Sequence, residues 1–198
     1  MSVDALESHF PQAGEIKHEV VISPVQVVRY YQGLDGANSR EDVIKMIGLY
    51  PRWSLVQLTP QKLSQLDWYL ASKDDPSHIS WSLTQNGSRR KLIDVARQYL
   101  ATPQKELAAK WKGYTKIEDM VSSLKMGRNL KPVIIVGGDR YPNSPESSFI
   151  DGVHRALAAM VYYEKFHPDD FVFEAYQGNK ASLFERISRR FYSLTLSL

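Results

Sequence analysis

Apolar residues recur along the chain with two different periods, and both periods are interleaved from one end to the other. Short apolar or alternating runs, typical of strands, occur at 16–22, 25–31, 53–58, 133–136, 148–150 and 171–176. Helical spacing behind capping, proline or glycine signals occurs at 39–48, 59–70, 88–100, 103–112, 115–127, 153–166 and 180–192. The mixture excludes all-α and all-β classes and predicts an α/β (α+β) domain, a small mixed sheet surrounded by helices.

The segment 131–163 has the strongest local pattern. Val133–Val136 is a continuous β-branched run that predicts a buried strand, and Gly137 and Gly138 end it. After a second short strand, Gly152 permits a sharp turn into a helix that begins near Val153. A strand, a tight turn and a helix N-terminus together present unpaired N–H groups and a positive dipole end. This arrangement predicts an anion site, with phosphate as the natural ligand.

The residues of this turn have side chains that suit a phosphate ligand. Gly152 permits close backbone approach, Arg155 can pair bidentately with phosphate oxygens, and His154 can donate to an oxygen or act as a general acid or base. Asp151 is a candidate for binding Mg²⁺ or for orienting His154. The alternative interpretation is structural: Asp151 and Gly152 form only a turn, and His154 and Arg155 are surface residues.

Two acidic residues in the following loop are further candidates. We expect Asp139 and Glu146 to face the same end of the sheet as the Gly152 turn, as a metal ligand or as the group that positions attacking water. Gly137 and Gly138 would let this loop close over bound phosphates.

A family resemblance bears on the same residues. The sequence Asp-Gly-Val-His-Arg-Ala-Leu-Ala-Ala at 151–159, behind the Pro-Val-Ile-Ile-Val strand, resembles the signature of the ParB/sulfiredoxin superfamily, over residues 117–176. The resemblance implies that the turn holds a nucleotide phosphate; family members hydrolyse or transfer phosphate, cut DNA, or clamp DNA under CTP control. Sulfiredoxin has its catalytic cysteine where Val153 stands, and this chain has no cysteine, so sulfinate reduction is excluded.

The size of the chain indicates which branch of the superfamily it resembles more. Chromosome-partitioning members carry acidic and basic residues where Val153 and His154 stand, and a helix-turn-helix domain for which this chain leaves no clear room. The chain is more similar to small plasmid-encoded members that inhibit fertility. The implied function is an ATPase with DNase activity that blocks conjugative plasmid or T-DNA transfer. Its substrate would be ATP or another nucleoside triphosphate, its cofactor Mg²⁺ or another divalent cation, and its partner the conjugative transfer machinery.

Two basic segments suggest a DNA contact. Arg89, Arg90 and Lys91 crowd the predicted start of the helix at 88–100, the unfavourable end for cations, and the final helix carries Arg186, Arg189 and Arg190. We expect DNA, if bound, to lie on these residues through its phosphates and without sequence preference. The alternatives are that these side chains are merely solvated, or that the protein is a non-catalytic inhibitor that binds DNA or a protein through them.

Composition sets the outer limits. A formal net charge of +3 in 198 residues is compatible with nucleic acid but does not demand it. No apolar run approaches the roughly 18 residues of a membrane span, and the N-terminus does not resemble a secretory signal, so we expect no membrane partner and a cytoplasmic location. Residues 1–14 are expected to be a loose end. Residues 15–198 are expected to form one domain with its core at 117–176. The region up to about residue 58 would either add strands to this core or form an extension. There is no Walker loop and no zinc-hydrolase histidine spacing.

Overall fold

The described part of the chain forms one mixed β-sheet with helices on both faces. The computed structural model describes residues 19–34, 40–68, 90–110, 113–137 and 148–179. Within them the sheet has seven strands in the order β1-β2-β7-β5-β6-β3-β4. Their bounds are β1 Glu19–Ile22, β2 Arg52–Leu58, β3 Asp67–Trp68, β4 Arg90–Lys91, β5 Val133–Val136, β6 Ser148–Asp151 and β7 Phe173–Asn179. β5 runs parallel to β7 and β3 parallel to β6, and the other pairs are antiparallel, which confirms the predicted fold class.

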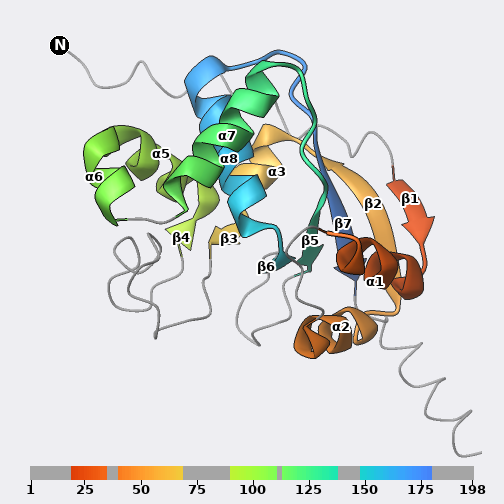
Figure 1. Cartoon of the computed structure of the whole chain (residues 1–198). Helices are drawn as coiled ribbons and strands as arrows, with labels where there is room; N and C mark the ends of the chain where they lie inside the picture. The colour runs from red at the N-terminus through yellow and green to blue at the C-terminus, as the bar shows by residue number, and fades with distance from the viewer. Residues whose placement is uncertain (1–18, 35–39, 69–89, 111–112, 138–147, 180–198) are drawn as a thin grey trace, which may run out of the picture.

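The helices form two groups, as Figure 1 shows. One group consists of α1 (Pro24–Gln32) and α2 (Glu41–Gly48), which lie together at one side of the sheet. The other group consists of α3 (Pro60–Ser64), α5 (Leu92–Ala101), α6 (Gln104–Lys110), α7 (Tyr114–Lys125) and α8 (Val153–Phe166). None of the helices in the described segments is long and apolar enough to cross a bilayer.

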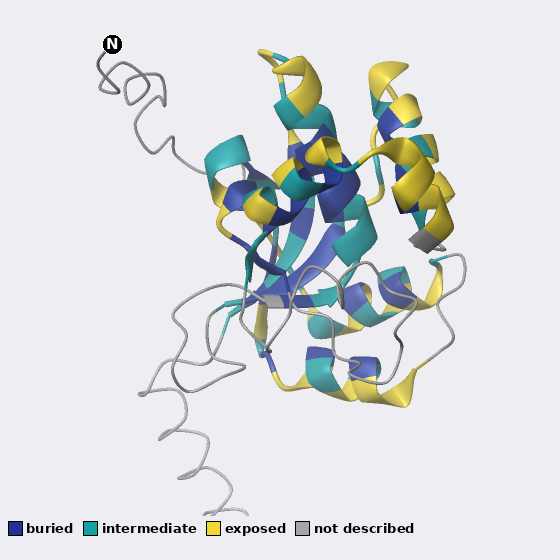
Figure 2. Ribbon diagram, turned by 90° about the vertical axis from the view of Figure 1, so that its left-hand side faces the viewer, coloured by how far each residue is buried: buried dark blue, intermediate teal, exposed yellow. Residues whose placement is uncertain are grey.

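The central strand β5 is buried on both faces, which explains its uninterrupted apolar sequence. Val133 and Ile135 belong to the larger core, with α5, α7 and α8. Ile134 and Val136 point to the other face and join the smaller core under α1 and α2. Successive side chains of a strand alternate between faces, so only a strand covered on both sides needs four apolar residues in a row. Figure 2 shows the buried strands between helices whose outer sides are exposed.

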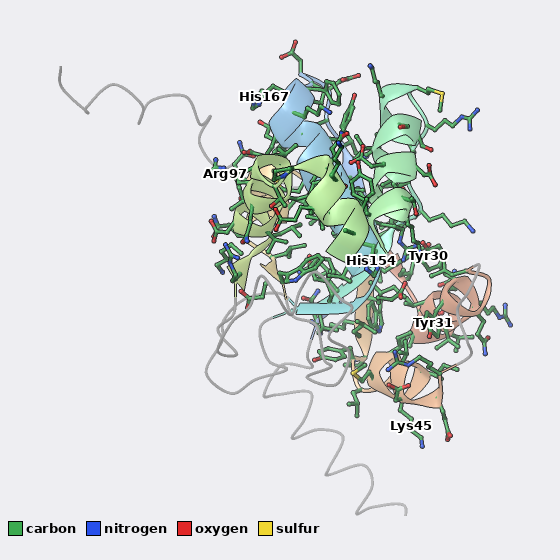
Figure 3. The ribbon with its side chains drawn as sticks, turned by 60° about the vertical axis from the view of Figure 1, so that its left-hand side comes forward. Tyr30, Tyr31, Lys45, Arg97, His154 and His167 are labelled. Atoms are coloured by element: carbon green, nitrogen blue, oxygen red, sulfur yellow. The ribbon has the colours of Figure 1, made fainter. Side chains whose placement is uncertain are left out.

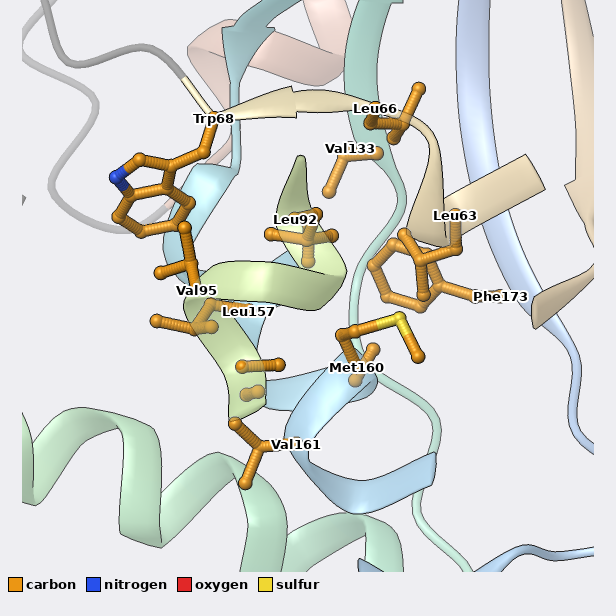
Figure 4. Close-up of a cluster of buried hydrophobic side chains, with 14 of the residues drawn as sticks. Leu63, Leu66, Trp68, Leu92, Val95, Val133, Leu157, Met160, Val161 and Phe173 are labelled. Atoms are coloured by element: carbon orange, nitrogen blue, oxygen red, sulfur yellow. The ribbon is translucent and has the colours of Figure 1, made fainter. Parts of the chain in front are cut away.

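The larger core is built mainly by α8 against α5 and the sheet. Leu157, Met160 and Val161 of α8 are almost fully buried beside Leu92 and Val95 of α5 (Figure 4). Three alanines are also fully buried, so α8 is buried on all sides over residues 156–161: Ala156, Ala158 and Ala159. The helix predicted for 153–166 is confirmed, and its middle is enclosed by the sheet, α5 and α7.

The predicted strand at 25–31 is wrong, because this segment is the helix α1. Ser23 caps the helix, because its hydroxyl accepts a hydrogen bond from the Gln26 backbone N–H. In turn, the Gln26 side-chain oxygen accepts one from the Ser23 backbone N–H at 2.7 Å. Pro24 occupies the first turn, where its missing N–H costs nothing. These capping interactions outweigh the β propensity of the run, and Val27 and Tyr31, four residues apart, pack against the sheet.

Two predicted helices are shorter than expected, because residues near one end of each form short strands. The helix predicted for 59–70 ends at Ser64, and the helix predicted for 88–100 begins at Leu92. Asp67–Trp68 and Arg90–Lys91 pair as β3 and β4 instead. The Leu92 N–H also donates to the Leu66 carbonyl at 2.9 Å. This pairing is non-local, and local periodicity does not reveal it.

The start of α7 also differs from expectation, whereas its end agrees. The helix predicted to begin at 115 begins at Tyr114, after Gly113. Within it, the Glu118 carboxylate accepts from the Tyr99 hydroxyl at 2.7 Å. Gly127 has a left-handed φ of +73° and ends the helix as predicted.

Of the remaining expectations, one is met by the described strands and the others concern residues that the structure does not describe. The region before residue 58 adds β1 and β2 to the sheet, as predicted. The loose end predicted for 1–14 and the final helix predicted for 180–192 lie outside the described residues.

Gly178 provides a test of the packing between β7 and β2. A Cβ atom at residue 178 would lie 2.8 Å from the indole of Trp53, which is fully buried. We expect Gly178→Ala to lower the free energy of unfolding by about 1–3 kcal/mol, because the ring has no room to move. Urea unfolding followed by circular dichroism measures the change.

Gly48→Ala is the matched control, because a Cβ at residue 48 would meet no atom within 4 Å. That variant should leave stability unchanged or raise it by up to about 1 kcal/mol. Equal stability of the two variants would contradict the packing described for Trp53.

Candidate functional site

The predicted sharp turn at Gly152 is confirmed. β6 ends at Asp151, Gly152 has φ +89°, and α8 begins at Val153. A Cβ atom at residue 152 would lie 2.6 Å from Nη2 of Arg155 and 2.7 Å from Cγ1 of Val133. Both the backbone conformation and the close approach therefore require glycine at this position.

Asp151 and Arg155 form an ion pair across this turn. Nη2 of Arg155 lies 2.6 Å from Oδ2 of Asp151, and only 13% of the Arg155 side chain is exposed. The guanidinium rests against Gly152, as the Cβ position shows. The alternative that Arg155 is an ordinary surface residue is therefore wrong. Asp151 holds Arg155, whereas the sequence had suggested Mg²⁺ or His154 as its partner.

His154 lies in the same first turn of α8 and is partly buried. Figure 3 shows it at the end of α8 that faces α1 and α2, whereas His167 lies at the far end of the helix. The fold thus brings Asp151, Gly152, His154 and Arg155 together, as their proximity in sequence implies.

Tyr30 of α1 is a member of this site that sequence reasoning missed. Its hydroxyl donates to the Pro132 carbonyl at 2.6 Å, and its ring centroid lies 4.5 Å from that of Tyr176. Burial raises the pKa of Tyr30 to about 12; the Arg155 guanidinium opposes this shift through charge and a hydrogen bond, and Asp151 adds to it. Tyr30 lies more than a hundred positions from Arg155 in the chain. Because a strand was predicted for 25–31, the sequence did not indicate that a helix packs beside the Gly152 turn.

Tyr31 and Arg40 extend the same group of polar residues. Burial is the main cause that raises the pKa of Tyr31; the negative charge of Asp151 adds to the shift and the charge of Arg40 opposes it. Arg40 precedes α2 and pairs with Asp42 at 2.7 Å on the surface. Asp151 therefore lies within electrostatic reach of residues from α1, α2 and α8.

Gly137 does not lie beside this turn. The antiparallel pairing of β5 with β6 places Val136 opposite Ser148 and Ile134 opposite Asp151. Gly137 follows Val136, so it lies at the opposite end of the strand pair from Gly152. This position does not support the predicted role of Gly137 in closing a loop over phosphates at the Gly152 turn. The Gly137 N–H donates to Gly178 at 3.0 Å and so continues the sheet. The three other residues predicted in this loop lie outside the described residues: Gly138, Asp139 and Glu146.

The two described members of the basic segment at 89–91 are engaged within the fold. The Arg90 guanidinium donates to the Gln98 side chain, and Nζ of Lys91 lies 3.3 Å from the buried Asp67 carboxylate. These contacts join β4 to α5 and β3. The other predicted DNA contacts lie outside the described residues: Arg89, Arg186, Arg189 and Arg190.

A divalent cation finds no complete ligand set among the described side chains. No group of three or more His, Asp or Glu residues gathers in the segments that the structure describes. The Asp151 carboxylate is already neutralised by Arg155, and a cation placed there would meet the guanidinium charge. Asp151, in its ion pair with Arg155, therefore does not by itself make a Mg²⁺ site.

Substitution of Gly152 tests the close packing of Arg155 and Val133 against the turn. Gly152→Ala should lower the free energy of unfolding by more than Gly127→Ala, which we expect to cost about 1–2 kcal/mol for left-handed backbone strain alone. Both glycines have positive φ, but a Cβ at Gly127 would meet no atom within 4 Å. The close contacts with Arg155 and Val133 should add about 1–3 kcal/mol at Gly152. Urea unfolding of both variants measures the difference, and equal losses would contradict the packing of Arg155 over the turn.

Comparisons of the chain with protein-family models, with curated proteins and with solved structures found no match. The resemblance to the ParB/sulfiredoxin superfamily stays a prediction.

Proposed function

We propose that the protein is a nucleoside-triphosphate hydrolase whose phosphate site is the Gly152 turn and the first turn of α8. The observation that carries the proposal is the close approach of the largely buried Arg155 guanidinium to the backbone of Gly152, at the N-terminus of a 14-residue helix. A fixed cation beside the N-terminus of a helix is an arrangement that suits phosphate.

The start of α8 favours an anion. Its first turn contains no acidic residue, and its N-cap, Gly152, has no side chain to cap it. Val153 and Arg155 precede Ala156, whose N–H makes the first helical hydrogen bond, with the Gly152 carbonyl at 3.0 Å. A terminal phosphate would accept from their N–H groups and from the Arg155 guanidinium. Exchange of the Asp151 carboxylate for phosphate would keep the guanidinium neutralised.

The reaction we propose is hydrolysis of the terminal phosphoanhydride bond. Water attacks the γ-phosphorus, His154 accepts the proton of that water, and the bond from phosphorus to the bridging oxygen breaks. Orthophosphate and nucleoside diphosphate leave. Arg155 stabilises the charge that develops on the phosphoryl oxygens. The substrate would be ATP or another nucleoside triphosphate, with its Mg²⁺.

DNA is the second substrate within this proposal. A phosphodiester offers the same non-bridging oxygens to the Gly152 turn, so DNase activity and inhibition of conjugative plasmid transfer would depend on the same residues. The non-catalytic alternative, an inhibitor that binds DNA or a protein through basic helices, gains no support from Arg90 and Lys91, which hold parts of the fold together.

Arg155→Lys tests phosphate binding. Lysine keeps the charge but loses the planar fork, so the affinity for a non-hydrolysable ATP analogue should fall, by an amount on the order of 1.5–3 kcal/mol for a charged hydrogen bond. Isothermal titration calorimetry measures the affinity, with and without Mg²⁺. Arg97→Lys is the control: Arg97 also pairs with α8, through Glu164 at 2.8 Å, but far from its N-terminus. Unchanged affinity in Arg155→Lys would refute the site.

His154→Ala tests catalysis. We expect the release of phosphate from ATP, CTP or GTP to fall by about a hundredfold or more, because the group that accepts the proton is lost. The melting temperature should change little, since Val153 and Ala156 to Val161 supply the packing of α8.

His167→Asn is the matched histidine control at the other end of α8. His167 has a left-handed φ of 43°, which asparagine tolerates. Its phosphate release should equal that of the unmodified protein. Full activity in His154→Ala would contradict the catalytic role, and absence of activity in the unmodified protein would favour the non-catalytic inhibitor.

A further inference from the structure

The C-terminal ends of α7 and α8 lie at the same end of the molecule, as Figure 1 shows, and carry two apolar side chains that are open to solvent. Phe166 is 40% exposed and Met126 is 63% exposed. Neither is a member of the larger or the smaller core. Tyr162, one turn earlier in α8, supports the Phe166 ring, and the two ring centroids are 5.2 Å apart. The ring is therefore held in place and yet open to contact with a partner.

Two lysine side chains, one from each helix, converge on the Phe166 ring. Nζ of Lys125 lies 5.6 Å from the ring centroid, and Nζ of Lys165 lies 5.5 Å from it. Within the described segments, neither ammonium forms an ion pair with a carboxylate. An aromatic face attracts ammonium groups, but two like charges that share one ring also repel each other. An anion beside the ring would relieve this repulsion.

The helix dipole explains only part of this arrangement. Lys125 and Lys165 each occupy the last turn of a helix, where the negative end of the dipole stabilises a cation. The dipole does not explain why both approach one exposed ring, because it has no preferred direction around the helix axis. Arg128, in the turn after Gly127, is a third exposed cation at the end of α7 and pairs with none of the described carboxylates.

We propose that this surface binds single-stranded nucleic acid, and we define the Phe166 patch by its residues: Lys125, Met126, Arg128, Lys165 and Phe166. Phosphates pair with the cations, and an unpaired base stacks on the Phe166 ring. Each nucleotide carries one negative charge beside one flat aromatic base, which complements cations gathered around an exposed ring. A double helix keeps its bases stacked inside, so it engages only the cations.

The Phe166 patch is separate from the Gly152 turn. The two lie at opposite ends of α8, whose 14 residues span about 20 Å at the usual rise per residue. The inference therefore does not depend on the proposed hydrolysis. It also uses cations other than Arg90 and Lys91, which are engaged within the fold.

The first test measures the binding of a fluorescein-labelled oligothymidylate by fluorescence anisotropy at several salt concentrations. In the variant with both Lys125→Gln and Lys165→Gln, the dissociation constant should rise. The slope of log affinity against log salt should become shallower by about 1.4, because each lost phosphate contact contributes about 0.7. The control removes two exposed charges elsewhere, with Lys62→Gln on α3 and Lys105→Gln on α6. An equal change in the two double variants would overturn the inference.

Substitutions of Phe166 test the stacked base. Phe166→Leu keeps an apolar side chain but loses the aromatic face, so the dissociation constant for the oligothymidylate should rise about fivefold or more, whereas Phe166→Tyr should stay within about twofold of the unmodified protein. Both variants should keep the fold, since Phe166 belongs to neither core, and circular dichroism checks this. Unchanged binding in Phe166→Leu would overturn the inference.

Two other ligands distinguish the class of partner. Phe166→Leu should not weaken binding of the oligothymidylate–oligoadenylate duplex, whose bases stay stacked on each other. Vesicles of phosphatidylcholine and phosphatidylserine should not bind through Lys125 and Lys165. An equal loss with the duplex, or vesicle binding that depends on the two lysines, would overturn the inference in favour of a duplex or a membrane surface.

Arg155→Lys separates this inference from the proposed function. The double lysine variant should raise the dissociation constant by the same factor with and without Arg155→Lys, because distant sites contribute independently. If the protein releases no phosphate from nucleotides but binds oligothymidylate through the Phe166 patch, the proposed function fails and this inference stands. If the unmodified protein binds no oligothymidylate, this inference is overturned, whatever its hydrolytic activity.

Discussion

The left-handed backbone at Gly152 is the constraint on which the site depends. With φ +89° the chain leaves β6 and enters α8 within one residue, and any side chain there would strike Arg155 and Val133. The absent Cβ leaves the space that the guanidinium fills. The same residue thus sets the direction of α8 and admits the cation beside the first turn of that helix. The proposed phosphate site would depend first on this backbone geometry and then on the side chains around it.

The sheet makes this geometry rigid. β5 is covered by α8 on one face and by α1 and α2 on the other, so Val133 and Pro132 cannot move independently of either layer. Val133 touches the turn and Pro132 accepts the Tyr30 hydroxyl. Because protein interiors are close-packed, a shift in one layer is transmitted to the other. The described site is therefore shared between two helical layers that meet through one central strand.

Charge is balanced locally around the turn. Arg155 would be costly to hold at 13% exposure without a partner, and Asp151 supplies one on the preceding residue of the strand. A phosphate would bring the same kind of oxygen ligand as Asp151 does. The ion pair is consistent with an anion site that is occupied by the protein's own carboxylate until a ligand replaces it.

The sequence by itself determined the features that depend on neighbours in the chain. Val133–Val136, Gly152, the start and end of α8 and the Gly127 stop were predicted, because apolar periodicity and positive-φ glycines act locally. The helix at 25–31 is also a local feature, because Ser23 and Gln26 form a capping box that outweighs the β propensity of the run. Tertiary structure decided the rest. Arg90–Lys91 became a strand because Asp67–Trp68 pairs with it. Tyr30 was placed against Pro132, and Gly137 away from the Gly152 turn, because helix docking and strand register depend on residues far apart in the sequence.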